Sequence, residues 1–376
     1  MMSLKKIFNL MAFTILTTTL LMNNVQAKEG SEQEEAKPTT IVLDKNDDRV
    51  KEYEADKLLF MQSEDKGTTL LFSDSPETVP DDGVLYEDTV KGDTRLLYYH
   101  VNGTEQDKKI AVVLRNMSDK PNKVTITREA VAGPSADYLY VGKVTMQRYF
   151  GEQKTREITL RPHGRALLRP EDGQRIIPSG DLVYGIFDFH AEQNLKTTVV
   201  LAPSNADLYD YARYVPVLSK DKQLLRGTFR KADRYLTNRI PYDTKRKENA
   251  YFYIGDNKTD LYRYGTDRTD RLRAHNFGNY GINYHIHLDV EGEGKTSYYL
   301  KPMGGVYAGA MTVQVGKDGE KKLISTPDSM PFFGHDKNLN YYAYLGTYDN
   351  SDDVYFEYTP PGASNLPVQM ILVPEK

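Results

Sequence analysis

The chain of 376 residues contains no cysteine and no tryptophan. The absence of cysteine excludes disulfide bonds, thiolate metal ligands, a cysteine nucleophile and lipid attachment at an N-terminal cysteine. A chain of this length can bury enough apolar surface to fold without disulfides. Beyond the N-terminal segment there is also no apolar run of membrane-spanning length, so we expect a protein that is not integral to the membrane.

The first 27 residues have the pattern of a secretory signal peptide. Two lysines precede an apolar run over 7–22, and small residues stand at both cleavage-site positions of Val25-Gln26-Ala27. These features are the n-region, the h-region and the cleavage site of an exported protein, and an uncleaved anchor is the alternative. We expect cleavage after Ala27, a secreted protein at the extracellular cell surface, and a flexible charged tether over 28–39.

The charge balance is mildly acidic, with 49 Lys and Arg against 53 Asp and Glu. Removal of Lys5 and Lys6 with the leader gives a formal charge of −6, so nucleic acid is not an expected partner. One segment, 226–247, departs from this balance with eight basic residues against Asp233 and Asp243. It could contact anionic envelope polymers or lipid headgroups, or it could be an ordinary solvated face between domains.

Short runs of β-forming residues separated by turn residues extend from Thr40 to the C-terminus. Regular strands of this kind predict an all-β fold of antiparallel sandwiches with little helix. Eight of the 28 tyrosines precede residue 206 and 20 follow it, which indicates two unlike halves. We therefore expect two antiparallel β-sandwich domains, over 40–205 and 206–376, that join near 202–222. The one helical candidate, 137–150, is expected to form one or two turns.

A histidine pair is the sharpest candidate for metal chemistry. His285 and His287 stand at i and i+2 on a predicted strand, so both imidazoles would point to one face. Together with Glu291 they resemble the first metal motif of the cupins, although the glycine frame of that motif is not matched. Glu291 or His335 is the expected third ligand of a transition metal. The alternative is two half-exposed strand histidines without a metal.

Four aspartates supply the hard oxygen ligands that Ca²⁺ prefers: Asp256, Asp260, Asp267 and Asp270. Arginines alternate with these acids, so salt bridging on a solvated loop is the alternative explanation. No Gly-x-Ser-x-Gly nucleophile motif occurs in the sequence. Glycosidase chemistry needs only two carboxylates, and 53 acidic residues leave such a pair unassigned, so the catalytic residues are unknown at this point.

The tyrosines of the second half include two alternating pairs. Tyr251 and Tyr253, and likewise Tyr342 and Tyr344, are two residues apart and would share one face of a sheet. A row of exposed tyrosines offers broad contact area at little entropic cost, which suits the binding of a glycan or a protein. Ordinary packing within a sheet is the alternative, since tyrosine is a favoured strand residue.

Three short stretches carry a resemblance to known proteins: 111–116 (AVVLRN), 278–284 (GNYGINY) and 302–309 (PMGGVYAG). They resemble uncharacterised exported proteins of Gram-positive spore-forming bacteria. Some of those proteins carry copper amine oxidase N-terminal-like domains, also called stalk domains. No stalk domain is evident in this chain, and the cofactor motif of the amine oxidases is missing. The resemblance therefore implies an exported β-protein and no oxidase activity.

Together these features predict an extracellular protein of the bacterial cell envelope that binds a partner or plays a structural part without catalysis. Its expected partner is an envelope polymer or a surface protein, and no cofactor is expected. The alternative is a secreted enzyme that acts on glycans or has a metal-dependent, cupin-like activity.

Overall fold

The computed structural model describes residues 39–375, which form one compact unit. The predicted signal peptide and all but the last residue of the predicted tether lie outside the described residues. Within the described range the fold is all-β, and the prediction of little helix is confirmed, since the α-helices are α1 (Tyr138–Phe150) and α2 (Leu208–Tyr214). Three short 3-10 helices complete the helical structure of the described residues: η1 (Asp48–Glu52), η2 (Pro170–Gln174) and η3 (Thr244–Arg246). No helix in this part of the chain is long and apolar enough to cross a membrane.

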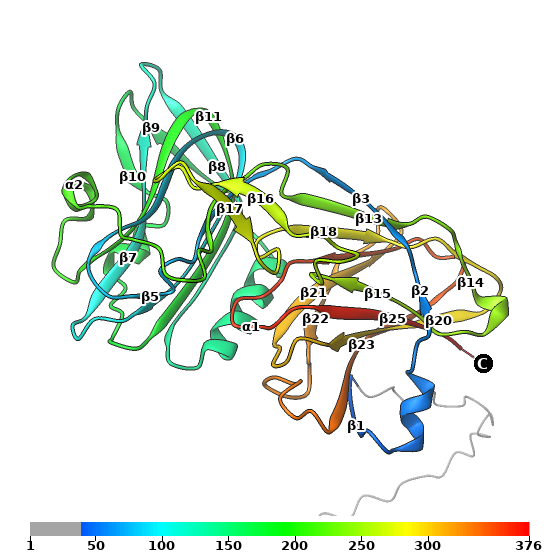
Figure 1. The fold of residues 1–376 in the computed structure, drawn as a ribbon. Coiled ribbons are helices and arrows are strands. Elements are labelled where there is room, and N and C mark those ends of the chain that lie inside the picture. The colour runs from blue at the N-terminus through cyan, green and yellow to red at the C-terminus, as the bar shows by residue number, and fades with distance from the viewer. Residues whose placement is uncertain (1–38, 376) are drawn as a thin grey trace, which may run out of the picture. The chain divides into compact units, whose positions relative to one another are not determined.

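The strands form three large sheets (Figure 1). Sheet A is six-stranded and consists of β1 (Thr40–Asp44), β23 (Leu339–Asp349), β20 (Lys295–Pro302), β25 (Val368–Pro374), β15 (Ala250–Ile254) and β2 (Lys57–Leu58). Sheet B is also six-stranded and consists of β22 (Lys322–Thr326), β21 (Gly309–Val315), β24 (Val354–Tyr358), β18 (Asn283–His287), β13 (Asp233–Asn238) and β3 (Met61–Lys66). A short parallel pair, β14 (Tyr242–Asp243) and β19 (Val290–Glu291), stands apart.

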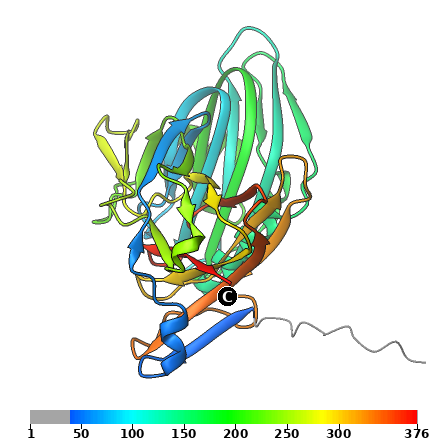
Figure 2. The same ribbon diagram turned by 90° about the vertical axis from the view of Figure 1, so that its right-hand side faces the viewer.

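Sheet C contains eleven strands. Its main path runs through β10 (Arg165–Leu167), β7 (Lys108–Asn116), β11 (Leu182–Pro203), β6 (Gly83–Asn102), β4 (Thr69–Ser73), β12 (Arg226–Phe229), β16 (Arg263–Thr266) and β17 (Arg273–Asn276). Three further strands pair beside this path: β5 (Thr78–Val79), β8 (Asn122–Ser135) and β9 (Arg156–Leu160). Figure 2 shows the long strands of this sheet side by side as curved ribbons.

Two very long strands turn sheet C into a sandwich. Residues 182–191 of β11 pair with β8, whereas residues 195–203 pair with β7, and the register on β6 shifts between Ala191 and Leu195. A register irregularity of this kind bends a strand, so the two halves of β6 and β11 contribute to different layers. Apolar side chains from both layers, such as Tyr98, Val112 and Phe187, meet in one buried cluster between them.

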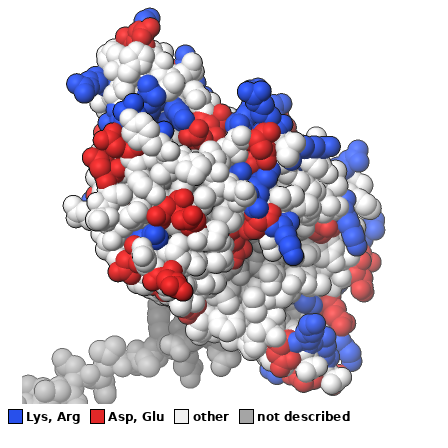
Figure 3. All heavy atoms as spheres, turned by 60° about the vertical axis from the view of Figure 1, so that its left-hand side comes forward, with Lys and Arg blue, Asp and Glu red and all other residues white. Residues whose placement is uncertain are grey.

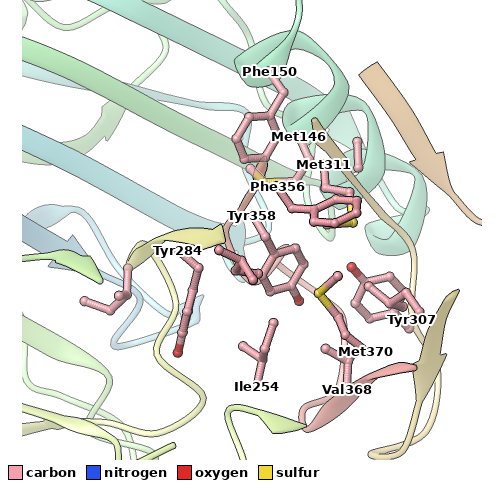
Figure 4. Packing of buried hydrophobic residues seen from close by; sticks show 14 of the residues in the cluster. Met146, Phe150, Ile254, Tyr284, Tyr307, Met311, Phe356, Tyr358, Val368 and Met370 are labelled. Carbon is pink, nitrogen blue, oxygen red and sulfur yellow. The ribbon is translucent and has the colours of Figure 1, made fainter. Parts of the chain in front are cut away.

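Sheets A and B pack face to face and enclose the largest core of the molecule. The ring of Tyr298 on β20 lies 5.3 Å from that of Phe356 on β24, and both are at most 2% exposed. Figure 4 shows this region, where Met370 of β25 and Tyr358 of β24 point toward one another.

Helix α1 closes one end of this core. Asp137 caps the helix, because its carboxylate accepts a hydrogen bond from the Tyr140 N–H at 3.0 Å. Met146 and Phe150 lie on the buried side of the helix near Met311 (Figure 4). The predicted helix is therefore present, and at thirteen residues it is longer than the expected one or two turns. The Asp137 cap and the burial of one side of the helix stabilise it over more residues than its mixed polar sequence predicts.

The strands of the two halves are interleaved across the expected boundary at residues 205 and 206. β12, β16 and β17 extend sheet C, whereas β1 and β2 join sheet A, and β3 joins sheet B. Most strand pairs are antiparallel, as predicted, whereas β4 pairs in parallel with β6, β13 with β18, and β2 with β15. Parallel pairs need crossover connections, and for β13 with β18 and β2 with β15 the paired strands are far apart in sequence.

We expect cleavage after Arg213 to leave the molecule assembled. Helix α2 lies in an exposed connection, where the Tyr214 side chain is 74% exposed, so trypsin should reach it. The fragments should nevertheless elute together in native buffer, because β4 pairs with β12 and β3 with β13 across the cut. Size-exclusion chromatography with and without urea measures this. Separation into two folded fragments in native buffer would contradict the interleaved topology.

Candidate functional site

A pocket of about 770 Å³ lies where sheet C meets the end of helix α1 and two loops of the second half. Strand β4 supplies Phe72, β6 supplies Tyr99, and β11 supplies Tyr184, while the segment before α1 forms the rim. The loops that follow β17 and β24 bring Tyr280 and the segment 362–365 to the opposite side. The volume is in the range of small-molecule binding sites, which makes this pocket the candidate functional site.

The charge of the pocket comes from three acids, Asp74, Glu77 and Asp137, and its lining contains no Lys, Arg or His. Asp74 is 9% exposed, and its Oδ1 is buried without a hydrogen-bond partner. Side chains alternate along a strand, so Asp74 lies on the same side of the chain as Phe72, whereas Ser73 lies on the other. Burial raises the pKa of Asp74 well above its usual value, and the negative charges of nearby acids add to that rise.

Glu77 is half-buried beside Asp74 along the same wall. Burial raises the pKa of Glu77, and the charge of Asp221 raises it further. Asp221 also holds this segment in place, because its carboxylate accepts hydrogen bonds from the Ser75 hydroxyl at 2.7 Å and the Glu77 N–H at 2.8 Å. Asp221, which does not line the pocket, therefore fixes the backbone that carries Asp74 and Glu77.

Aromatic rings form the walls of the pocket. Phe72 and Tyr280 stack with ring centroids 6.5 Å apart, and Tyr99 and Tyr184 meet edge to face at 5.6 Å. The phenol of Tyr280 donates to the Ser364 carbonyl at 2.8 Å, which fixes its ring against the loop of residues 362–365. Ring faces in such a pocket offer contact to apolar groups, sugar rings or cations.

The loop that follows β24 is clamped against the pocket at both of its sides. The Ser364 hydroxyl donates to the Ala308 carbonyl and accepts from the Ala308 N–H, both at 3.0 Å. Gly362 lies so close to the ring of Tyr99 that a Cβ there would come within 2.6 Å of it. A Cβ on Gly142 of α1 would in turn lie 2.1 Å from the Gly362 carbonyl oxygen. The two glycines allow this approach, which makes the pocket largely preformed.

A serine and a histidine lie together on the opposite side of β4. The Ser73 hydroxyl and His100 Nε2 are 2.9 Å apart, and His100 Nδ1 is 2.9 Å from the Pro76 carbonyl oxygen. Both side chains are at most 2% exposed, and neither lines the pocket. Burial lowers the pKa of His100 to about 4, so the imidazole is neutral near pH 7. This pair is inaccessible to a ligand and serves the core of sheet C.

The predicted histidine pair does share one face of β18, but the expected third ligands lie elsewhere. The His285 ring stacks on Tyr235 and that of His287 on Tyr355, each with centroids 4.6 Å apart. Both histidines line a hollow of about 260 Å³ on the outer face of sheet B, whose lining does not include Glu291. Glu291 lies on β19 beside β14, and the His335 ring packs against Phe332 and Tyr341.

Among residues 39–375, no group of three or more His, Asp or Glu side chains is placed to hold a metal ion. The four aspartates of the Ca²⁺ hypothesis are engaged with basic and backbone groups. Asp260 pairs with Arg234, Asp267 with Arg226, and Asp270 with Lys220 at 2.6 Å, while Asp256 accepts backbone hydrogen bonds from its own turn. Asp260 and Asp267 are buried, so the alternative of a solvated loop does not describe them either.

The four predicted ligand-binding tyrosines lie on one face of sheet A, as their spacing predicts. Tyr251 and Tyr253 contact each other edge to face on β15, with ring centroids 5.5 Å apart. Tyr342 is fully buried, because the ring of Tyr53, just after η1, covers it at 4.8 Å. Tyr344 is partly buried beside Tyr299. The expected row of exposed rings is therefore partly closed by the N-terminal segment.

The basic segment 226–247 is not a continuous surface patch. Arg226 and Arg234 are 3% and 4% exposed and form buried ion pairs, whereas Arg239 and the lysines near η3 are exposed. On the face drawn in Figure 3, basic and acidic side chains are interspersed with large uncharged areas. Some of the basic side chains of this segment are therefore buried and paired with acids, and the others are exposed to solvent.

The pocket residues were not among the sequence candidates. The one local signal in the sequence is Asp74, which directly follows the apolar run 69–73. It is two residues after Phe72, so its side chain is expected on the same buried side of the strand. Tyr99, Tyr184 and Tyr280 carry no signal of their own, because they come from three distant segments. Tyrosine enrichment pointed to the second half, yet most rings of the pocket belong to the first.

No protein-family model matches the chain, and no curated protein matches it. Among solved structures, a Paenibacillus xanthan lyase is similar at 10% identity with a TM-score of 0.19, over 80% of this chain and 27% of that chain. The chain thus spans about a quarter of the lyase. Oxalate decarboxylase from Bacillus subtilis gives 10% identity, a TM-score of 0.11, and coverage of 83% and 76%. Vicilin from hazelnut gives 11% identity, a TM-score of 0.12, and coverage of 84% and 83%. Scores at this level carry no argument about function.

Proposed function

We propose that this chain is an exported, non-catalytic binding protein of the bacterial cell envelope, and that its ligand occupies the pocket beside β4. The observation that carries this proposal is the pocket itself, about 770 Å³ in volume, with acids on one wall and tyrosine rings on the others. The hydrogen bonds of Ser364 and the close packing at Gly362 hold the adjoining loop in place, so the pocket exists before a ligand binds. A ligand therefore binds without the entropic cost of ordering this loop. The signal-peptide pattern supports the extracellular location.

The test uses the chain from Lys28 onward, incubated with isolated wall, membrane and surface-protein fractions. Ala136 lies exposed at the pocket rim, so Ala136→Trp should narrow the entrance without disturbing the core. We expect the unmodified chain to sediment with one fraction and Ala136→Trp to bind it at least about tenfold more weakly. Met117→Trp is the matched control, because Met117 is 42% exposed and does not line the pocket. Equal binding by all three proteins would refute the pocket as the binding site.

A second candidate function is cleavage of glycans. It is favoured by two acids in one pocket, Asp74 and Glu77, whose pKa values are both raised, as a general acid requires. Incubation with purified wall glycan and measurement of new reducing ends tests it. Activity that is lost in both Asp74→Asn and Glu77→Gln would establish the enzyme in place of the binding protein. We expect no release above that of a heat-inactivated control.

A further inference from the structure

Asp74 differs from every other buried acid of the described chain. Five carboxylates in residues 39–375 are buried: Asp74, Asp172, Asp260, Asp267 and Glu357. Four of them have a basic partner, namely Arg175, Arg234, Arg226 and, for Glu357, both Arg128 and Lys321. Asp74 forms no ion pair, and its Oδ1 accepts no hydrogen bond. A buried carboxylate without a counter-charge is costly, so it either takes up a proton or binds a positive charge from outside the chain.

The pocket rings are likewise without a cation of their own. Elsewhere in the described residues, cationic side chains lie over tyrosine rings, as with Arg273 over Tyr264 at 3.9 Å and Lys66 over Tyr235 at 4.0 Å. None of the cation–ring contacts in this part of the chain involves a ring that lines the pocket. Aromatic faces beside a carboxylate are the arrangement by which proteins recognise organic ammonium ions.

We propose that the ligand of this pocket carries an organic ammonium group, which binds between the Asp74 carboxylate and the rings of Tyr99 and Tyr280. This inference rests on the proposed function and names the chemical class of its ligand. The ammonium group supplies the counter-charge that the lining lacks, and the ring faces contact its carbon substituents. Glu77 and Asp137 at the same pocket strengthen the attraction at longer range. An uncharged sugar of the same size could donate hydrogen bonds to Asp74 but would supply no counter-charge.

Two matched pairs of probes test this inference by titration of the chain from Lys28 onward. Hexylammonium and hexanol, and likewise glucosamine and glucose, differ essentially by one ammonium group. We expect each ammonium probe to bind at least about tenfold more tightly than its neutral partner near neutral pH. A stronger preference within the sugar pair identifies an amino sugar, and one within the alkyl pair identifies an aliphatic amine. Equal binding within both pairs, or binding of none of the four, overturns the inference.

Asp74→Asn separates recognition from a structural effect, because it keeps the shape of the side chain and removes its charge. We expect this variant to lose the ammonium preference while its melting temperature without ligand does not fall, since Asp74 has no basic partner within the chain to lose. The ammonium probe should raise the melting temperature of the unmodified chain and not that of the variant. Asp119→Asn, at a 95% exposed turn position, should behave as the unmodified chain does. A lower melting temperature and an unchanged ammonium preference in Asp74→Asn would refute the role of Asp74.

The binding site and the chemical class of its ligand are tested separately by these experiments. If Ala136→Trp abolishes binding to an envelope fraction but neutral and ammonium probes bind alike, the binding pocket stands and the ammonium class is wrong. If ammonium probes bind through Asp74 but no envelope fraction is retained, the ligand class stands and the envelope function is wrong.

Discussion

Replacing Arg234 with methionine should lower the free energy of unfolding by about 3–5 kcal/mol. Arg234 lies on β13 and is 4% exposed. Its guanidinium pairs with Asp65 on β3 at 2.7 Å, and with Asp260 in the loop after β15. Methionine fills much of the same volume but leaves Asp260, itself 5% exposed, without its positive partner. Removing one charge of a buried pair leaves the other charge without compensation, and this is the main cause of the lost stability.

Urea unfolding followed by the near-ultraviolet circular dichroism of the tyrosines measures this change. Arg239→Met is the matched control, because Arg239 lies one residue past the same strand, with an exposed side chain. We expect the control to change stability by less than about 0.5 kcal/mol. A loss below about 1 kcal/mol for Arg234→Met would mean that this pair behaves as a surface salt bridge.

The sequence could not assign these charges, because the partners of each pair are far apart along the chain. Arg234 and Asp65 are 169 residues apart, so local reading grouped Arg234 with its basic neighbours instead. In the same way, Asp260 and Asp267 appeared as possible Ca²⁺ ligands because of their mutual spacing. Spacing indicates which residues share a strand face or a turn, but it does not indicate which distant strand lies opposite.

The same limit explains which parts of the fold were predictable. Strand-forming runs, the helix over 137–150 and the shared face of Tyr251 and Tyr253 follow from local sequence patterns, and the structure contains them. The interleaving of the halves depends on pairings such as β4 with β12, which no local pattern specifies. The pocket is the extreme case, since its lining comes from segments between Phe72 and Asn365.

His100 should make the fold less stable as the pH falls. Its imidazole is 2% exposed between the Ser73 hydroxyl and the Pro76 carbonyl. Burial is the main cause that lowers its pKa to about 4, from an ordinary value of 6.5; the charge of Arg226 lowers it further, whereas the bond to Pro76 and the charge of Asp221 oppose the shift. The unfolded chain therefore takes up a proton below pH 6.5 that the folded chain excludes until about pH 4.

His100 therefore makes the folded state more stable at neutral pH than at acidic pH. The stabilising contribution of His100 is complete above pH 6.5, decreases as the pH falls toward about 4, and does not change further below that value. At about 1.4 kcal/mol per pH unit, the loss over this window is about 3 kcal/mol. Asp74 and Glu77 act in the opposite direction, because their pKa values are raised in the folded state. The total pH dependence of the protein is therefore a difference between opposing groups.

His100→Asn isolates the histidine contribution. The asparagine amide can still donate to the Pro76 carbonyl, but it takes up no proton in this pH range. Urea unfolding at several pH values between about 7 and 4 gives the free energy of each protein. We expect the advantage of the unmodified chain over His100→Asn to shrink by about 3 kcal/mol across this window, whatever its size near neutral pH. His163→Asn, at a 55% exposed position, is the matched surface control. A constant difference between the unmodified chain and His100→Asn would show that His100 takes up its proton equally in the folded and unfolded states.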